Sequence, residues 1–208
     1  QSRESYLAGS FGVQPWSEAV ALPHAHAVVV YHHQSVEELR RVLTHELSHL
    51  FFGSFFLSKP DALPTWLDEG MATNMEDVVL GQRLSVLRET DPKSFPNFET
   101  FVVTIPSRHD SESVVGMWYQ QAFGTVRFMS SNSNKLKFVS YCKKLLAGSP
   151  PERALWEVYK IRNWKLFDER WRQWLEQEQA DEQGQGGGAA SSRFQRSGMF
   201  SNSSEFFK

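Results

Sequence analysis

Two histidines one helical turn apart constrain the fold of this chain more than any other feature. Residues 45–49 read His-Glu-Leu-Ser-His. In an α-helix, positions i and i+4 lie on one face, so both imidazoles can bind the same metal ion. Glu46 follows the first histidine, and its carboxylate would then lie beside the metal and accept a proton from an activated water. The pattern predicts a helix with a metal site; the alternative is that His45 and His49 are ordinary surface residues.

The flanking sequence predicts that helix independently. Ser35-Val36-Glu37-Glu38 is a capping box, in which Ser35 is the N-cap and the Glu38 side chain reaches back to it. Apolar residues then recur at helical spacing; they are Val36, Leu39, Val42, Leu43, Leu47 and Leu50. We therefore predict a helix over residues 35–52 that ends near Gly53.

A third metal ligand is expected on a neighbouring element. The His-Glu-x-x-His pattern is typical of zinc sites, and a catalytic Zn²⁺ usually has three protein ligands plus a water. A second helix is predicted from Thr65 to about Val79, after a loop long enough to bring it back against the first. Asp68 and Glu69 both lie in its first turn, and on chemistry alone either could be the third ligand.

The two segments together resemble the gluzincin family of the peptidase MA-like superfamily, which includes thermolysin and the zinc aminopeptidases. The resemblance rests on His45 to His49, followed by Trp-Leu-Asp-Glu-Gly-Met-Ala at residues 66–72. It implies an α+β, zincin-like fold, a Zn²⁺ cofactor and hydrolysis of peptide bonds in a peptide or protein substrate. Nineteen residues separate His49 from Glu69, one more than the aminopeptidases typically have, so a strict count selects Asp68. The Glu-Gly-x-Ala context selects Glu69, and we take Glu69 as the expected ligand.

The resemblance continues into a later helix. Residues 119–129, from Tyr119 to Met129, are similar to the stretch of the family in which a tyrosine precedes an aromatic-x-x-Val-Arg sequence. The resemblance implies that the Tyr119 hydroxyl donates to the oxyanion of the tetrahedral intermediate. The alternative is core packing, because the same helix also carries Trp118 and Phe123.

Two departures from the family limit what the resemblance implies. The Gly-x-Met-Glu-Asn motif, with which the aminopeptidases anchor a free N-terminus, does not occur in this sequence, so exopeptidase activity is unsupported. Only 34 residues precede Ser35, which is enough for one or two strands. We expect either a reduced sheet or further strands upstream in a longer parent protein.

Other polar residues are weaker candidates for the site. Glu76 could orient a histidine ligand from behind, and Thr73 shares a helical face with Glu69. His109 lies in a long connection and could be a second oxyanion donor. The remaining histidines lie before the predicted helix, and we expect each pair to be structural or solvated; they are His24, His26, His32 and His33.

The other elements complete a mostly helical domain. Residues 27–31 are predicted to form a buried strand, and residues 80–112 a long connection with a short helix or a functional loop. Four further helices are expected at about 113–129, 135–146, 151–159 and 164–179. The domain is expected to span residues 1–182, followed by a flexible or disordered tail at 183–208 that begins Gly-rich and contains four phenylalanines. That tail could instead dock in an apolar cleft.

Composition excludes several classes of protein. The net charge of −2 is unlike the basic footprint of a nucleic-acid binder. A single cysteine, Cys142, precludes an intrachain disulfide and a cysteine-based zinc site. No apolar run approaches the 18 or more residues of a membrane span. The sequence begins at Gln1 rather than Met, which suggests a processed or excised chain, so the compartment cannot be read.

Three functions remain open from the sequence. The first is a zinc metallopeptidase with Glu46 as general base. The second is a zinc hydrolase that acts on another bond, since a fold and a ligand set do not fix the substrate. The third is a binding module that retains a zinc site. Glu46 argues against this third function, because a structural zinc site has no evident use for a base at that position.

Overall fold

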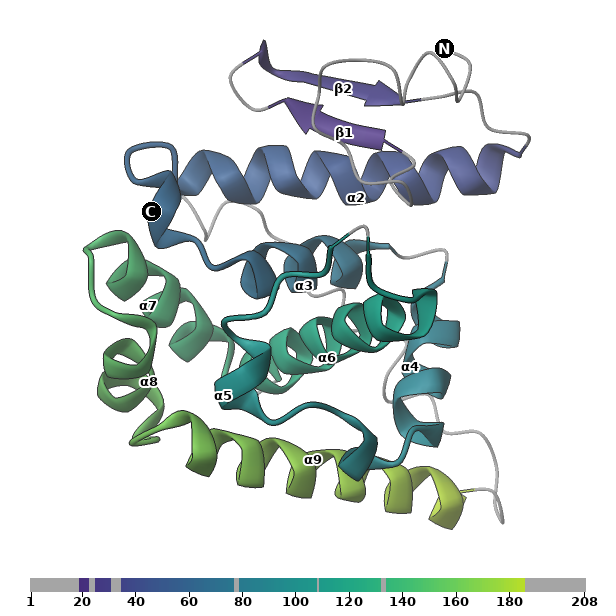
Figure 1. Ribbon diagram of the computed structural model, residues 1–208, viewed down its shortest axis with the longest axis vertical. Helices are drawn as coiled ribbons and strands as arrows, with labels where there is room; N and C mark the ends of the chain where they lie inside the picture. Colours follow the sequence, from purple (N-terminus) through teal and green to yellow (C-terminus); the bar gives the residue numbers. More distant parts are fainter. Residues whose placement is uncertain are drawn as a thin grey trace.

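The computed structural model describes residues 19–22, 25–30, 35–76, 79–107, 109–131 and 134–185. The chain is mostly helical, with a two-stranded antiparallel sheet near the N-terminus (Figure 1). Its elements are β1 (Ala19–Leu22), β2 (Ala27–Val30), α2 (Val36–Phe55), η2 (Pro60–Ala62), α3 (Thr65–Met75), α4 (Leu80–Glu89), η3 (Pro92–Ser94), α5 (Phe98–Phe101), α6 (Glu112–Ser130), α7 (Lys135–Leu146), α8 (Pro151–Tyr159) and α9 (Trp164–Gln185).

Helix α2 is the boundary between the sheet and the helical body. The β1–β2 hairpin lies along one side of α2, and α3 and α6 lie on the other (Figure 1). The strands pair with Ala19 opposite Val30 and Leu22 opposite Ala27. The predicted strand at 27–31 is confirmed at Ala27–Val30, but it is half-buried rather than buried. Strand β1 was not predicted, because no turn signal in the sequence marks where its four residues begin.

The N-terminus of α2 confirms the predicted cap. The Ser35 side chain accepts a hydrogen bond from the Glu38 N–H at 3.0 Å. The expected end near Gly53 is wrong, because the helix continues to Phe55. Phe52 and Phe56 are both buried, with ring centroids 5.6 Å apart. Burial of these rings on one face extends the helix past a glycine, at a propensity cost of only about 1 kcal/mol.

The predicted long connection contains three ordered elements, α4, η3 and α5. Helix α4 packs on the body through Leu87, which is 1% exposed. Arg172 of α9 fixes the following turn, because its guanidinium donates to the carbonyl groups of Pro92, Phe95 and Pro96. Asp168 pairs with the same guanidinium at 2.8 Å. Tertiary contacts, rather than local sequence signals, therefore order this region.

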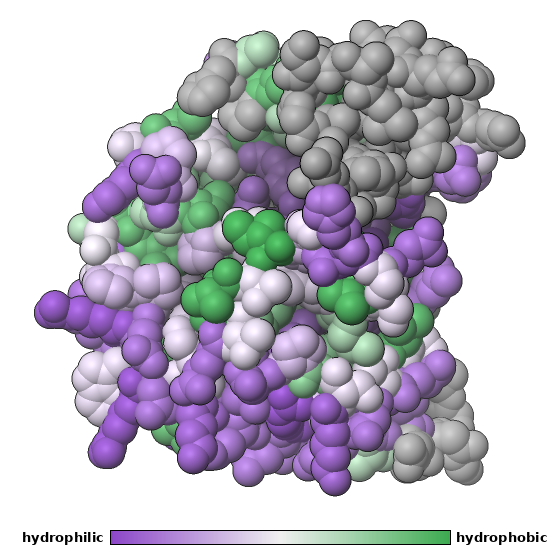
Figure 2. Space-filling view, viewed as in Figure 1, coloured by the Kyte–Doolittle hydropathy of each residue, from purple (hydrophilic) through white to green (hydrophobic). Residues whose placement is uncertain are grey.

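An aromatic cluster joins α5 to α9 and forms the centre of the core. The Phe98 ring lies 4.7 Å from that of Phe167 and 5.4 Å from that of Trp171, centroid to centroid. All three side chains are fully buried. Helix α9 continues to Gln185, beyond the predicted end at 179. Hydrophilic side chains cover the lower part of the face in Figure 2, over α9.

The predictions for residues outside the described ranges stay predictions. They concern the tail at 183–208, apart from the last residues of α9, and also His24, His32 and His33. His26 is described and exposed, with a positive φ of 48°. Among the described helices, none is long and apolar enough to cross a membrane.

Helices α3 and α6 cross closely at Gly70. A Cβ atom at this position would lie 2.5 Å from the Ala122 carbonyl oxygen and 2.7 Å from a Val126 methyl carbon. Asn74 reinforces the crossing, because its side-chain amide donates to the carbonyl groups of Gly70 at 2.7 Å and Phe123 at 3.0 Å. The backbone beside Glu69 is therefore held against α6.

We expect Gly70→Ala to destabilise the protein by about 1–3 kcal/mol, because the added methyl group has no space. Each kcal/mol corresponds to roughly 2–4 °C in Tm for a chain of this size. Gly53→Ala is the matched control, since a Cβ there meets no atom within 4 Å, and it should leave Tm unchanged or raise it. Thermal melts by circular dichroism measure both variants. Equal Tm values for Gly70→Ala and wild type would contradict the close crossing.

Candidate metal centre

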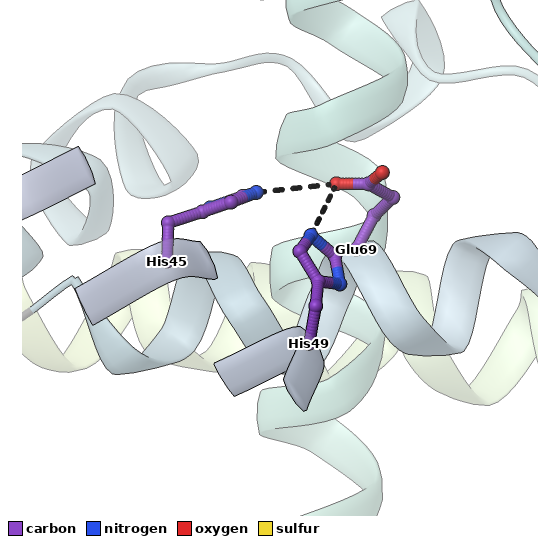
Figure 3. Close-up of side chains that lie close together, drawn as sticks. All are labelled: His45, His49 and Glu69. Carbon is purple, nitrogen blue, oxygen red and sulfur yellow. Dashed lines mark ion pairs between the residues drawn. The ribbon is translucent and has the colours of Figure 1, made fainter. Parts of the chain in front are cut away.

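Three side chains from α2 and α3 converge on one point (Figure 3). His45 and His49 lie one turn apart on the face of α2 that meets α3. The His45 Nε2 atom lies 3.4 Å from Glu69 Oε2, and the His49 Nε2 atom lies 3.8 Å from the same oxygen. One donor atom from each residue lies within 4.8 Å of the others. The prediction that His45 and His49 lie on one face of a helix is confirmed, since α2 presents both imidazoles to the Glu69 carboxylate of α3.

The Glu69 carboxylate fits a cation at this point. Its Oε2 atom is buried and accepts no hydrogen bond from the described residues. A buried carboxylate oxygen that accepts no hydrogen bond is costly unless a cation lies against it. Two imidazole nitrogens and one carboxylate oxygen are the donor set of many catalytic zinc sites. The three residues therefore suit a divalent ion such as Zn²⁺.

A second carboxylate holds His45 from behind. Glu76 Oε1 lies 2.8 Å from His45 Nδ1, which leaves Nε2 facing Glu69. Glu76 follows the last residue of α3, and its backbone leaves helical geometry at φ −70°, ψ 72°. This turn explains why the helix ends at Met75 rather than at the predicted Val79. The expectation that Glu76 orients a histidine is confirmed by this contact.

Two arginines hold Glu76 in turn. Arg83 of α4 donates to Glu76 Oε2 from its NH2 atom at 2.7 Å and from Nε at 3.3 Å. Arg41 of α2 lies 3.8 Å from the same oxygen. The Glu76 side chain is only 2% exposed, so these cations offset the cost of burying its charge. Neither arginine was predicted. Arg41 could have been found, because it lies one turn before His45 on the same helix.

Asp68 faces the Nδ1 atom of His49, the nitrogen that points away from Glu69. Its Oδ2 atom lies 3.1 Å from His49 Nδ1, whereas the group of possible metal ligands contains Glu69. Each histidine therefore has a carboxylate at Nδ1 and Glu69 at Nε2. This arrangement gives Asp68 the role that Glu76 has toward His45.

The sequence matches the family model of the peptidase MA superfamily over residues 7–177. This range includes both predicted metal-binding segments. The chain belongs to the peptidase MA superfamily. Searches of curated proteins and of solved structures found no match.

The electrostatics of this peptidase MA domain favour a cation between the three side chains. Burial lowers the pKa of His45, but its close contacts with the Glu69 and Glu76 carboxylates and the negative charges of both outweigh burial and raise the pKa to about 10. Burial acts in the same direction on His49, and the Asp68 and Glu69 carboxylates again raise its pKa. The carboxylates thus attract positive charge, and a metal ion would compete with these protons.

Glu46 lies beside the same centre. Its side chain is nearly buried, and burial raises its pKa, against the opposing influence of both histidines and of a hydrogen bond from the Ala21 backbone. A carboxylate with a raised pKa accepts a proton more readily at neutral pH. Strand β1 therefore contributes a contact to this residue, which the sequence did not predict.

The remaining candidates have other observed contacts. Thr73 donates from its hydroxyl to the Glu69 carbonyl oxygen at 2.6 Å, so it contacts the backbone of Glu69 rather than its carboxylate. Tyr119 is partly buried, with its ring 5.3 Å from that of Trp118. His109 donates its backbone N–H to Ser107 Oγ at 3.3 Å. The oxyanion roles of Tyr119 and His109 stay predictions.

We expect substitution of Glu69 to weaken zinc binding more than substitution of Asp68. Glu69→Gln replaces the buried oxygen that faces both Nε2 atoms, whereas Asp68→Asn changes only the partner of His49 Nδ1. Loss of such an orienting partner typically costs about 10–100-fold in metal affinity. Competition titration with a chromophoric chelator gives both dissociation constants. The reverse order would make Asp68 the third ligand.

We expect Arg83→Met to weaken zinc binding by roughly tenfold, because Glu76 loses its closest cation and holds His45 less firmly. Arg88→Met is the matched control on the same helix, since Arg88 pairs with Glu178 and Glu182 of α9 instead. Zinc affinity and Tm are measured for both. Equal losses of affinity in the two variants would mean that α4 acts only through general stability.

Proposed function

We propose that this chain is a gluzincin-type zinc metallopeptidase with a zincin-like fold. The observation that carries the proposal is the buried Glu69 oxygen, which has no hydrogen-bond partner among the described residues and lies 3.4 and 3.8 Å from the Nε2 atoms of His45 and His49. In the proposal these three residues hold Zn²⁺, and Glu46 is the general base. Membership of the peptidase MA superfamily supports peptides or proteins as the substrate class.

The side chains divide the chemistry between them. A zinc ion bound by these ligands would supply a Lewis acid that polarises the scissile carbonyl and acidifies a water. Glu46 would accept the proton of the attacking water and return it to the departing amine. Glu76 and Asp68 would keep the imidazoles in the orientation that leaves both Nε2 atoms free for the metal. Tyr119 would donate its hydroxyl to the developing oxyanion.

The environment of Glu46 favours an enzyme over a binding module. A purely structural zinc site is closed by its ligands and has no need of a nearby base. Here a carboxylate that is not a ligand lies on the same helix, nearly buried and with a raised pKa. Burying such a charge costs stability, which is understandable if the group transfers a proton. We propose residues 1–182 as the catalytic domain and 183–208 as a tail.

We expect Glu46→Gln to retain zinc and lose at least about 10²-fold in kcat/KM, because an amide cannot accept the proton. Glu37→Gln is the control, since it makes the same change on an exposed residue of α2. The assay follows cleavage of a mixed peptide library by mass spectrometry, with zinc content measured in parallel. A chelator should abolish cleavage, and added Zn²⁺ should restore it. Wild-type rates in Glu46→Gln would refute the proposed mechanism.

A further inference from the structure

The charge of the chain is distributed very unevenly. Residues 135–162, which comprise α7, α8 and the start of the turn to α9, carry seven basic and two acidic side chains. The remaining residues carry 15 basic and 22 acidic side chains. The segment, here termed the basic hairpin, thus has a net charge of +5 in a chain of net charge −2. It stands at one side of the molecule (Figure 1).

Both acidic residues of the basic hairpin are engaged within the fold. Glu157 pairs with Lys144 at 2.6 Å and with Arg153 at 2.9 Å. Glu152 accepts the backbone N–H of Trp164 at 3.1 Å. These contacts leave an excess of cations at the surface. They also bring Lys144 of α7 and Arg153 of α8 to one carboxylate, so the exposed faces of the two helices adjoin there.

Helix α7 separates its apolar and basic residues cleanly. Its buried face carries Phe138, Tyr141, Cys142 and Leu145. Its exposed residues other than Lys135 lie within an arc of about 120° on an ideal helix; they are Leu136, Lys137, Ser140, Lys143 and Lys144. The buried face fixes the helix to the body, so the lysines are presented from a rigid support.

Helix α8 adds an exposed indole among the cations. Trp156 is 44% exposed, and Arg153 lies one turn before it on the same helix. The Lys160 ammonium and the Arg162 guanidinium each lie 5.8 Å from the centre of its ring. On α7, Leu136 is 80% exposed. Apolar tips surrounded by long basic side chains are typical of surfaces that lie at a lipid interface.

We propose that the basic hairpin binds the surface of a membrane that contains anionic lipids. A surface of this kind needs diffuse positive charge and a few apolar tips, and it needs no groove. Lysine, a strongly hydrated point charge, accounts for five of the seven cations. Phosphatidylserine headgroups would approach these ammonium groups, while Trp156 and Leu136 reach the interfacial layer.

Three other occupants fit the surface less well. A nucleobase that stacked on Trp156 would compete with the cations that already lie over its ring. The C-terminal residues 186–208 carry three basic side chains and one acidic side chain. Their net positive charge disfavours binding to the positively charged hairpin. A second copy could offer the acidic end of α9, but two of its glutamates already pair with Arg88.

The test is sedimentation of the full chain with vesicles of phosphatidylcholine alone, or with about 30% phosphatidylserine added. Each basic residue near such a surface contributes about 1 kcal/mol, or roughly fivefold in the partition coefficient. We expect binding only to the anionic vesicles, and weaker binding as salt screens the charges. The variant Lys137→Glu with Lys143→Glu should lower the partition coefficient by at least roughly 25-fold. Trp156→Ala should lower it without changing the salt dependence.

The matched control is Lys93→Glu with Arg170→Glu, which makes the same change of charge at exposed positions outside the hairpin. We expect it to bind like wild type. Circular dichroism melts verify that all variants are folded. Equal losses in the control and hairpin variants would overturn the proposal, as would equal binding to both kinds of vesicle. Hairpin-dependent binding of polyuridylate or polyglutamate, without binding to the anionic vesicles, would also overturn it in favour of a nucleic-acid or an acidic-protein partner.

Discussion

Burial of carboxylates around two imidazoles is the constraint on which the rest of this structure depends. Glu69, Glu76 and Asp68 all approach His45 or His49 from α3 or its end. Carboxylates brought together in a partly buried space repel one another, so they stay ionised only if cations lie between or beside them. Arg83 and Arg41 meet this need at Glu76, and the imidazoles, protonated or metal-bound, meet it at Glu69.

The position of the carboxylates depends in turn on how α3 is supported. Glu69 is followed by Gly70, where a side chain would collide with the backbone of α6. Any larger residue would push α3 toward α2 and change the distance between Glu69 and the histidines. Asn74 closes the other end of the contact with hydrogen bonds to both helices. The glycine of the Glu-Gly-x-Ala sequence therefore fits this fold for a packing reason, in addition to its place in the family resemblance.

Local signals made part of the site predictable from the sequence. The capping box at Ser35 and the apolar spacing define α2, and the i, i+4 rule then places His45 and His49 on one face. The choice between Asp68 and Glu69 needed a resemblance, because adjacent carboxylates in one helical turn have the same chemistry. Arg83 could not be found this way, since its contact with Glu76 joins two helices across a turn. Strand β1 was not predicted, and α4 was expected only as a short helix or a functional loop without bounds, because the order of both elements comes from packing on α2, α6 and α9.

The two histidines differ in how firmly they are held. Glu76 is almost fully buried and bonded to Arg83 as well as to His45. Asp68 is more exposed, at 29% of its side chain, and its Oδ1 atom has no hydrogen-bond partner among the described residues. A carboxylate fixed by several partners loses less entropy when it orients a ligand, whereas one with a single contact can rotate away. It follows that the His45 imidazole is held in place more firmly than that of His49, which lies on the side of the freer Asp68 and can better absorb small shifts between α2 and α3.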